Sequence, residues 1–340
     1  MTRFGIIGFG AWGRCYAEAI TKLPGTVLGG IATGNADNMN ANTFGVAAKY
    51  VVADHKELLR TADIDVAVVA VPNHLHCQIG LDVLSAGKHL LIEKPFTLSV
   101  TESKTLIQTA AEKELHLVVG HQFRLSSLWG KIKEIIDSGA LGEPKYVLIE
   151  LSRNPYRQGA DGWRYDQSRV GNWILEEPIH FFDLAGWYLE SFGKPVSVYA
   201  SANTSLSPAP ELYDNLSAVV NFSNGSHAVI AQTLASFEHH QTVKITGTKG
   251  SLWASWSGAM DRTLHPTFFL KASDGTNINE IAIDKPAGEL FELEEQIVRM
   301  SQVIEGKAKV HCTGEDGCLA VALSLAAQES AQTGMVVSSE

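Results

Sequence analysis

The chain lacks an excess of basic residues, and it lacks long apolar runs. Its 340 residues carry 27 lysines and arginines against 37 aspartates and glutamates, a net charge of −10. This charge argues against nucleic acid, because contacts to phosphates require a basic face. No apolar stretch approaches the ~20 residues that span a bilayer. We therefore expect neither nucleic acid nor a membrane as a partner.

Cysteine is also scarce. Cys15, Cys77, Cys312 and Cys318 form no C-x-x-C pair and no spacing typical of a metal site. Scattered cysteines of this kind are typical of reduced thiols in the cytoplasm. We therefore expect a cytoplasmic protein with no bound metal.

The first part of the chain alternates candidate strands with candidate helices. This alternation predicts an α/β domain with a doubly wound parallel sheet over residues 1–121. Asp54 and Ser99 stand where helix N-caps are expected. The predicted strands are 3–7, 26–32, 66–71, 89–93 and 116–120, and the predicted helices are 11–22, 36–44, 55–60, 74–86 and 99–113.

The pattern changes after His121, where longer segments with period-2 alternation follow. They predict a second, α+β domain over residues 122–340, with a large, mostly antiparallel open sheet. The length of the chain also favours two domains, since single cores stop growing near ~250–300 residues. The predicted strands are 145–152, 195–202, 215–223, 226–235, 241–247 and 251–256, and the predicted helices are 126–138, 174–190, 288–305 and 314–334.

A glycine pattern follows the first predicted strand directly. Residues 8–13 read G-x-G-x-x-G, with a strand before them and a helix after them. In this context the pattern predicts a dinucleotide site, because the glycines let backbone N–H groups approach a pyrophosphate. The residues predicted to bind the cofactor here are Gly8, Phe9, Gly10, Ala11, Trp12 and Gly13.

The end of the second predicted strand bears on the choice of cofactor. An acidic residue is expected ~20 residues after the glycines, to bind the adenosine ribose. Thr33, Gly34 and Asn35 occupy this position, and none of them carries a carboxylate that would repel a 2′-phosphate. No lysine or arginine follows before Phe44 to grip that phosphate, and Asp37 offers an alternative ribose contact. The cofactor is therefore predicted to be NAD or NADP, with a slight preference for NADP.

The third and fourth predicted strands end in polar residues. Val71, Pro72, Asn73 and His76 follow the third strand, where open α/β sheets bind their ligands. We expect them to contact the cofactor, although His76 can equally hold a structural hydrogen bond. Residues 93–95, Glu93-Lys94-Pro95, end the fourth strand and place a cation at the same edge of the sheet.

These segments resemble the Gfo/Idh/MocA family, which includes glucose–fructose oxidoreductase and inositol dehydrogenase. The resemblance begins with P-N-x-x-H before E-K-P and covers nearly the whole chain. It implies a Rossmann domain and a second α/β domain whose open sheet forms the interface of a homo-oligomer, a dimer or tetramer. The further segments that carry it are 86–89, 138–144, 162–164, 247–250 and 314–317.

The resemblance also implies the catalytic residues. Lys94 matches the lysine that binds the reacting hydroxyl and assists proton transfer, and Glu93 precedes it. Residues 171–183 resemble the family segment G-G-x-x-x-D-x-G-x-H-x-x-D, so His180 is expected to act as the base, and Glu176 to orient it or to hold a neighbouring hydroxyl. Glu176 replaces the usual Asp, and Pro178 the usual Gly. Glu176 and His180 are four apart, which predicts one shared helix face. Without Lys94, an amphipathic helix with a buried histidine would explain this segment.

The remaining candidates line the substrate or the nicotinamide. Aromatic faces suit a polyol, and arginines suit an anionic substituent. Arg153 and Arg157 can equally lie on a solvated strand edge and loop. The residues predicted to bind substrate are Lys94, Arg124, Arg153, Tyr156, Arg157, Trp163, Glu176 and His180, and those predicted to contact the cofactor from this region are Gln122, Trp163 and Arg164.

Three functions are compatible with these residues. The first is an NAD(P)-dependent dehydrogenase that moves a hydride between nicotinamide and a secondary alcohol of a sugar, cyclitol or glycoside. The second is a redox-assisted glycosidase of the same family, which recycles a tightly held NAD. The third is a non-catalytic regulator that senses dinucleotides, since a fold does not fix a function. Lys94 and His180 together favour an enzyme.

Overall fold

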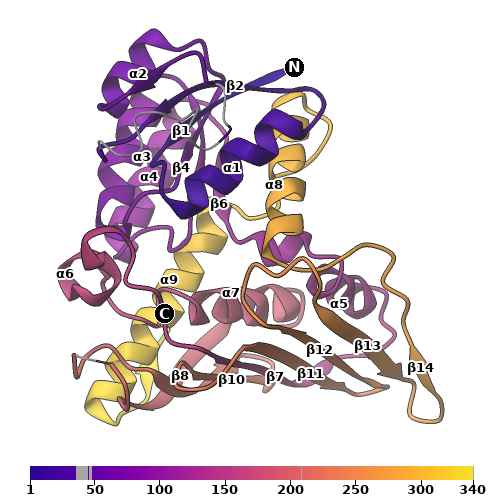
Figure 1. Cartoon of the computed structure of the whole chain (residues 1–340). Coiled ribbons are helices and arrows are strands. Elements are labelled where there is room, and N and C mark those ends of the chain that lie inside the picture. The colour runs from indigo at the N-terminus through magenta and orange to yellow at the C-terminus, as the bar shows by residue number, and fades with distance from the viewer. Residues whose placement is uncertain (36–44, 46–47, 208, 340) are drawn as a thin grey trace. The chain divides into compact units, whose positions relative to one another are not determined.

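The chain divides into two compact units (Figure 1). The computed structural model describes residues 1–35, 45, 48–207 and 209–339. The first unit comprises Met1–Gln122 and Leu293–Cys318, and the second comprises Phe123–Glu292 and Leu319–Glu340. The first unit thus combines the predicted range 1–121 with a segment from far along the chain.

In the described part of the first unit, six strands form one parallel sheet in the order β3-β2-β1-β4-β5-β6. This confirms the predicted doubly wound sheet. The order reverses between β1 and β4, and ligands bind at the carboxyl ends of the strands at such a point. The strands are β1 Thr2–Ile7, β2 Thr26–Ala32, β3 Val51–Val52, β4 Val66–Val69, β5 His89–Glu93 and β6 Leu117–Gly120.

The helices of this unit begin where the sequence predicts. The Asp54 side chain accepts a hydrogen bond from Lys56 N at 2.9 Å, and Ser99 Oγ accepts one from Glu102 N at 3.2 Å, so both are N-caps. The predicted helix 36–44 lies outside the described residues. The helices are α1 Ala11–Lys22, α2 His55–Thr61, α3 His76–Ser85, α4 Val100–Glu112 and, running beside α1 in Figure 1, α8 Glu289–Ile304.

The second sheet has nine strands among the residues that the structure places, in the order β14-β13-β12-β11-β7-β10-β9-β8-β15. Only the described pair β7 and β10 runs parallel, so the prediction of a mostly antiparallel sheet is confirmed. The sequence missed the three short or outer strands β13, β14 and β15. The strands are β7 Pro144–Arg153, β8 Pro195–Asn203, β9 Asn215–Phe222, β10 His227–Thr233, β11 His239–Gly247, β12 Ser251–Gly258, β13 Thr267–Ser273, β14 Ile278–Glu280 and β15 Val337–Ser338.

Helix α7 packs against β7 and β10 and covers one face of this sheet. The strands alternate buried and more exposed residues, as expected for a sheet covered on one side. Tyr199 and Trp253 are each 45% exposed. The helices are α5 Trp129–Asp137, α6 Gln167–Val170, α7 Pro178–Leu189 and α9 Gly314–Thr333. Among the described residues, no helix has the length and apolar character needed to cross a membrane.

A buried carboxyl at the start of α8 gives a test of this packing. Glu292 is 2% exposed, and burial raises its pKa from its ordinary 4.5 to about 7. Oε1 accepts a hydrogen bond from Gly288 N at 3.2 Å, and this bond and the Ser126 hydroxyl beside the carboxyl oppose the rise in pKa. The unfolded chain loses this proton near pH 4.5 and the folded chain near pH 7, so its stabilising contribution is lost as pH rises.

The variant Glu292→Gln keeps the shape of the side chain and stays neutral. We expect it to unfold nearly like the parent at pH 5 and to be more stable at pH 8 by roughly 3 kcal/mol, since one pKa unit is ~1.4 kcal/mol. Urea unfolding across pH 5–8 measures this difference. Glu294→Gln, at an exposed position of α8, is the control. A difference that does not change with pH would contradict the assignment.

Candidate functional site

Polar residues collect at the carboxyl ends of β1, β4, β5 and β6 in the first unit. Residues 8–13 follow β1, residues 71–73 follow β4, Lys94 follows β5, and Gln122 lies just beyond β6. Parallel pairing of β1 with β4 and of β4 with β5 brings these ends to one edge of the sheet. Four separate turns of the first unit therefore supply these predicted cofactor residues, and Thr33, Gly34 and Asn35 follow β2.

The glycine turn has the shape of a pyrophosphate cradle. Gly8 has φ +98°, and a β-carbon there would lie 2.4 Å from the Ala70 carbonyl oxygen. A β-carbon on Gly13 would lie 1.9 Å from the Gly8 carbonyl oxygen, whereas Gly10 has no described atom near that position. Gly8 and Gly13 thus form the tight turn, and Gly10 leaves its outer side open to a ligand. No side chain caps the N-terminus of α1 at Gly10, so its N–H groups can face phosphate oxygens.

Glu93, which precedes Lys94, is hydrogen-bonded to helix α1. Its Oε1 accepts hydrogen bonds from Trp12 Nε1 at 2.8 Å and from the Tyr16 hydroxyl at 2.6 Å. Burial raises the pKa of Glu93, and these two donors oppose the rise. The sequence analysis missed Tyr16, although it stands four residues after Trp12 and therefore on the same helix face. Glu93 fixes the backbone next to Lys94, and the Lys94–Pro95 bond is cis.

His76 has close backbone neighbours on both ring nitrogens. Nδ1 lies 2.7 Å from the Pro95 carbonyl oxygen, and Nε2 lies 3.0 Å from that of Val71. The ring is fully buried and joins the turn after β4 to the turn that holds Lys94. This arrangement favours the structural alternative for His76. Asn73 is buried beside it, and a cofactor contact for either residue stays a prediction.

The ribose end of the predicted site is only partly described. Thr33 is 5% exposed, and its backbone N donates to the Val52 carbonyl at 2.9 Å. Asn35 N donates to Thr33 Oγ1 at 3.4 Å. Asp37 lies outside the described residues. The described turn contains no carboxylate, but it does not decide between NAD and NADP.

In the second unit, Glu176 lies outside the helix that carries His180. Helix α7 begins at Pro178 with Glu177 as its N-cap, because proline is accepted in the first turn but not further in. The expectation of one helix face shared by Glu176 and His180 is therefore wrong. His180 is 2% exposed, and its ring centroid lies 4.6 Å from that of Phe123. Asp183 follows on the same helix and is also buried.

Each arginine predicted to bind substrate or cofactor lies against a carboxylate. The Arg124 guanidinium binds Asp183 through two nitrogens, at 2.9 and 2.7 Å, with both side chains buried. Arg164 Nε lies 3.1 Å from Glu176 Oε2, and its Cζ lies 4.5 Å from the centre of the Trp163 ring. The roles of these residues, substrate binding for Arg124 and cofactor contact for Arg164, stay predictions, and each guanidinium has a carboxylate neighbour within the unit.

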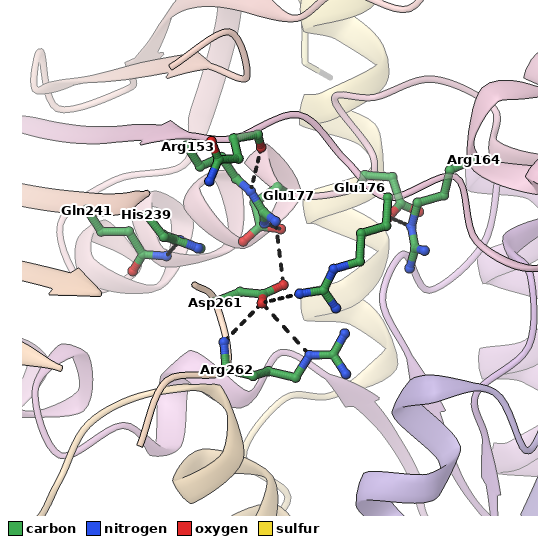
Figure 2. A network of polar contacts seen from close by, with 10 residues as sticks. Arg153, Arg164, Glu176, Glu177, His239, Gln241, Asp261 and Arg262 are labelled. Carbon is green, nitrogen blue, oxygen red and sulfur yellow. Dashed lines mark hydrogen bonds and ion pairs between the residues drawn. The ribbon is translucent and has the colours of Figure 1, made fainter. Parts of the chain in front are cut away.

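A further network of polar contacts includes Arg153, at the end of β7, and Asp261 (Figure 2). Its guanidinium donates to Glu177 Oε2 at 3.1 Å and lies 3.5 Å from Asp261 Oδ2. Arg157 donates to Asp261 Oδ1 at 3.2 Å. The Arg153 side chain is 10% exposed, so the solvated alternative fits it poorly, whereas that of Arg157 is 51% exposed.

The network also contains residues that the sequence did not single out. Glu177, Asp261, His239 and Gln241 come from the start of α7, the loop after β12, and β11. Only Glu177 lies within a recognised segment, residues 171–183, where the sequence assigned it no role. His239 and Gln241 stand at alternate positions of β11, so both point to the covered face of the sheet, but their long-range partners leave no trace in the local sequence.

The parallel sheet, the glycine cradle and the lysine at the crevice define an NAD(P)-dependent oxidoreductase with a second, sheet-based domain. Family models match both parts: residues 2–121 match the oxidoreductase family with an NAD-binding Rossmann fold, and residues 129–253 match the GFO/IDH/MocA C-terminal domain. The chain belongs to the GFO/IDH/MocA oxidoreductase family.

Individual relatives cover the whole chain. An uncharacterized oxidoreductase, YrbE, of Bacillus subtilis is 30% identical over 99% of this chain and 96% of its own length. Inositol 2-dehydrogenase of Rhizobium meliloti is 27% identical, with 96% of each chain covered. The structure of a levoglucosan dehydrogenase in complex with NADH and L-sorbose matches with a TM-score of 0.83 at 21% identity, over 100% of this chain and 99% of that one.

Proposed function

We propose that this oxidoreductase is a dehydrogenase of neutral sugars or cyclitols that uses Lys94 and His180 to handle the proton. The observation that carries the proposal is the position of Lys94 at the carboxyl end of β5, in the same unit and at the same sheet edge as the glycine cradle. Inositol and levoglucosan dehydrogenases among the similar proteins support the substrate class. No observation on the described residues favours the glycosidase or the regulator.

The proposed chemistry divides the work between the two units. When bound, the nicotinamide accepts the hydride in the oxidative direction or returns it in the other. Lys94 Nζ donates a hydrogen bond to the substrate hydroxyl oxygen and so stabilises negative charge on it. A ring nitrogen of His180 takes the hydroxyl proton as the hydride leaves the same carbon, and a carbonyl results. Glu176 and Glu93 act as positioning residues.

The charges of the second unit support a neutral substrate. Arg124, Arg153, Arg157 and Arg164 each face a carboxylate of the same unit, as described above. An anionic substituent at these arginines would approach carboxylates that they already contact, and like charges brought together cost several kcal/mol. The arginines therefore serve to hold the acids in place, and the acids accept hydrogen bonds from substrate hydroxyls.

Two further parts of the proposal concern the cofactor and the assembly. The Thr33-Gly34-Asn35 turn supports acceptance of NADP as well as NAD, with a slight preference for NADP, because it presents no carboxylate to a 2′-phosphate. The half-exposed Tyr199 and Trp253 on the open face of the second sheet support self-association through that face.

A titration and a substrate screen test this proposal. Calorimetry measures the affinities for NAD and NADP, and the preferred form is then mixed with myo-inositol, D-glucose, D-gluconate and D-glucuronate. We expect reduction of the cofactor with a neutral compound, at a kcat/KM more than about tenfold above that of either anion, a difference of ~1.4 kcal/mol. No hydride transfer to any compound, or a preference for the anions, would contradict the proposal.

A further inference from the structure

A chain of buried polar side chains links helix α8 to the strand that precedes Lys94. Gln296 Nε2 donates a hydrogen bond to the Tyr16 hydroxyl, and this hydroxyl donates to Glu93 Oε1 at 2.6 Å. Glu93 Oε2 in turn accepts a hydrogen bond from the backbone N of Lys94 at 3.3 Å. All four residues belong to the first unit, in which α8 runs beside α1 (Figure 1). A glutamine 280 positions along the chain from Tyr16 is therefore connected to the lysine.

Each hydrogen bond between these side chains presents a proton toward the Glu93 carboxyl. The Tyr16 hydroxyl accepts from Gln296, so its own proton points to Glu93 Oε1. Trp12 Nε1 donates to the same oxygen at 2.8 Å. Burial, and then the charge of Glu93, raise the pKa of Tyr16 well above its ordinary 10.0, so the hydroxyl remains a donor. Donors aligned in series polarise one another, so the bond from Gln296 strengthens the bond from Tyr16.

Strand β6 also packs against this carboxyl. Gly120 of β6 pairs with Glu93 of β5. A β-carbon at Gly120 would lie 3.0 Å from Glu93 Cα and 3.1 Å from Glu93 Oε1, which is tighter than ordinary van der Waals contact. Glu93 is 6% exposed, so its carboxyl has little free space and its position depends on the donors that hold it. A shift of those donors is therefore transmitted to the backbone of Lys94.

The buried amide of Gln296 is unfavourable for stability. The side chain is 0% exposed, and its neighbours on α8, Leu293, Ile297 and Met300, belong to the apolar core of the first unit. Its Oε1 has no hydrogen-bond partner among the residues that the structure describes. A buried polar atom without a partner destabilises a fold, whereas a leucine of similar size would leave no such atom. The stability of the core therefore does not explain this glutamine, but its bond to Tyr16 does.

We propose that Gln296 and Tyr16 are positioning residues that act on Lys94 through Glu93. This inference rests on the proposed function, in which Lys94 binds the reacting hydroxyl. It adds two residues that stand outside every motif recognised in the sequence. A misplacement of about 1 Å at a reacting group can cost ~10²-fold in rate. Hydrogen bonds remote from the substrate therefore contribute to turnover by fixing where the lysine lies.

Two single variants measure this contribution. Gln296→Leu removes the donor to Tyr16 together with the unpaired oxygen, and Tyr16→Phe removes the hydroxyl. For whichever of myo-inositol and D-glucose the parent prefers, we expect kcat/KM to fall about tenfold in Gln296→Leu and about 10–100-fold in Tyr16→Phe, mostly through kcat. Thermal unfolding of Gln296→Leu is expected at the temperature of the parent or above it. A loss of turnover without a loss of stability is a result that a purely structural role does not give.

A double variant tests the order of the chain. In Tyr16→Phe, the hydroxyl that receives the bond from Gln296 is absent. Adding Gln296→Leu should therefore have no further effect, so the two losses of kcat/KM do not multiply. Losses that multiply would show that Gln296 acts independently of Tyr16 and would overturn the inference.

The pH dependence tests the step through Glu93. Burial raises the pKa of Glu93, and the bonds from Tyr16 and Trp12 oppose the rise. Loss of the Tyr16 hydroxyl therefore raises this pKa further, and the carboxyl binds a proton at a higher pH than in the parent. Among the described residues, the other ionisable group that acts on Glu93 is Lys94.

We expect kcat/KM to decline, on acidification, at a higher pH in Tyr16→Phe than in the parent. In a Glu93→Gln background, where this position cannot titrate, Tyr16→Phe should cause no such shift. A profile that Tyr16→Phe leaves unchanged, or a shift of equal size in both backgrounds, would contradict the role of Glu93 in the chain.

Tyr188→Phe is the matched control. The Tyr188 hydroxyl is also buried and donates to the Trp129 carbonyl oxygen at 2.9 Å, within the second unit. Its removal should lower the stability about as much as Tyr16→Phe does, while kcat/KM stays like that of the parent. An equal loss of kcat/KM in both tyrosine variants would assign the loss to stability and overturn the inference.

The outcomes also separate this inference from the proposed function. Parent kinetics in both Gln296→Leu and Tyr16→Phe, together with an inactive Lys94→Ala, would overturn the positioning chain and leave the proposed dehydrogenase standing. Normal turnover by Lys94→Ala would defeat the proposed function, and this inference with it.

Discussion

Replacement of Lys94 by alanine lowers kcat/KM for the preferred polyol by about 10³-fold or more, while the affinity for the cofactor changes only a few-fold. General acid–base groups contribute ~10²–10⁴-fold to rates, and Lys94 also holds the reacting oxygen. Its backbone is fixed by Glu93, which Trp12 and Tyr16 hold from α1. The glycine turn at residues 8–13, which is expected to bind the pyrophosphate, does not include Lys94. The affinity for the cofactor should therefore be nearly unchanged in Lys94→Ala. Steady-state kinetics and calorimetry with the same preparations measure the two effects.

Two variants make this result specific. Lys94→Arg keeps the positive charge, but the guanidinium stays protonated and cannot share the proton, so we expect little recovery of kcat. Lys88→Ala removes a partly exposed lysine just before β5 and should leave kinetics unchanged. Normal turnover by Lys94→Ala would remove the lysine from the mechanism. A large loss of cofactor affinity would assign it to cofactor binding instead.

The largest effect on stability is expected at the Arg124–Asp183 pair. The two side chains are 5% and 1% exposed, and two hydrogen bonds join them. Asp183→Asn leaves the guanidinium buried without its counter-charge, which costs about 3–5 kcal/mol. For a chain of 340 residues, at ~2.1 cal/mol/K of unfolding entropy per residue, that corresponds to a fall in Tm of roughly 4–7 °C. Thermal unfolding followed by circular dichroism measures it.

A double variant distinguishes the effect of removing the whole ion pair from the effect of leaving Arg124 buried without a counter-charge. Arg124→Met with Asp183→Leu replaces both charges by apolar side chains, and we expect it to recover most of the lost stability. Lys131→Met breaks an exposed ion pair with Glu134 and should change Tm little. Asp183→Asn could instead unfold at the same temperature as the parent while KM for the polyol rises. That result would contradict a structural role for the pair and would assign Arg124 to substrate binding.

The fold was largely predictable from local signals. Asp54 and Ser99 cap helices as expected, and the glycine turn at 8–13 links β1 to α1. Alternation of apolar residues located the long inner strands of the second sheet. β15, with two residues, and β14, with three, are too short to show a period, and β13 presents an uneven burial pattern near the edge of the sheet. These outer strands depend on their neighbours rather than on their own sequence.

The site was predictable where motifs are contiguous, and less so where partners are distant. Lys94 and the glycines stand in short motifs whose context the sequence itself supplies. Glu176 was predicted to lie on the same helix as His180 because the two residues are four apart. Spacing alone does not show where a helix begins, and α7 begins at Pro178, after Glu176. His239 and Asp261 join Arg153 from other strands and loops, so only tertiary structure brings them together. The carboxylate partners of the arginines were likewise invisible in the sequence, which predicted a sugar, cyclitol or glycoside as substrate and left the role of the arginines open.

A crystal structure of the enzyme with NAD(H) and its preferred polyol tests the central claim most directly. The account predicts that Lys94 Nζ and a ring nitrogen of His180 both lie within about 3.2 Å of one substrate hydroxyl oxygen. It also predicts that the carbon bearing this hydroxyl faces the C4 atom of the nicotinamide. A complex in which the two side chains contact different hydroxyls, or in which either points away from the nicotinamide, would contradict it.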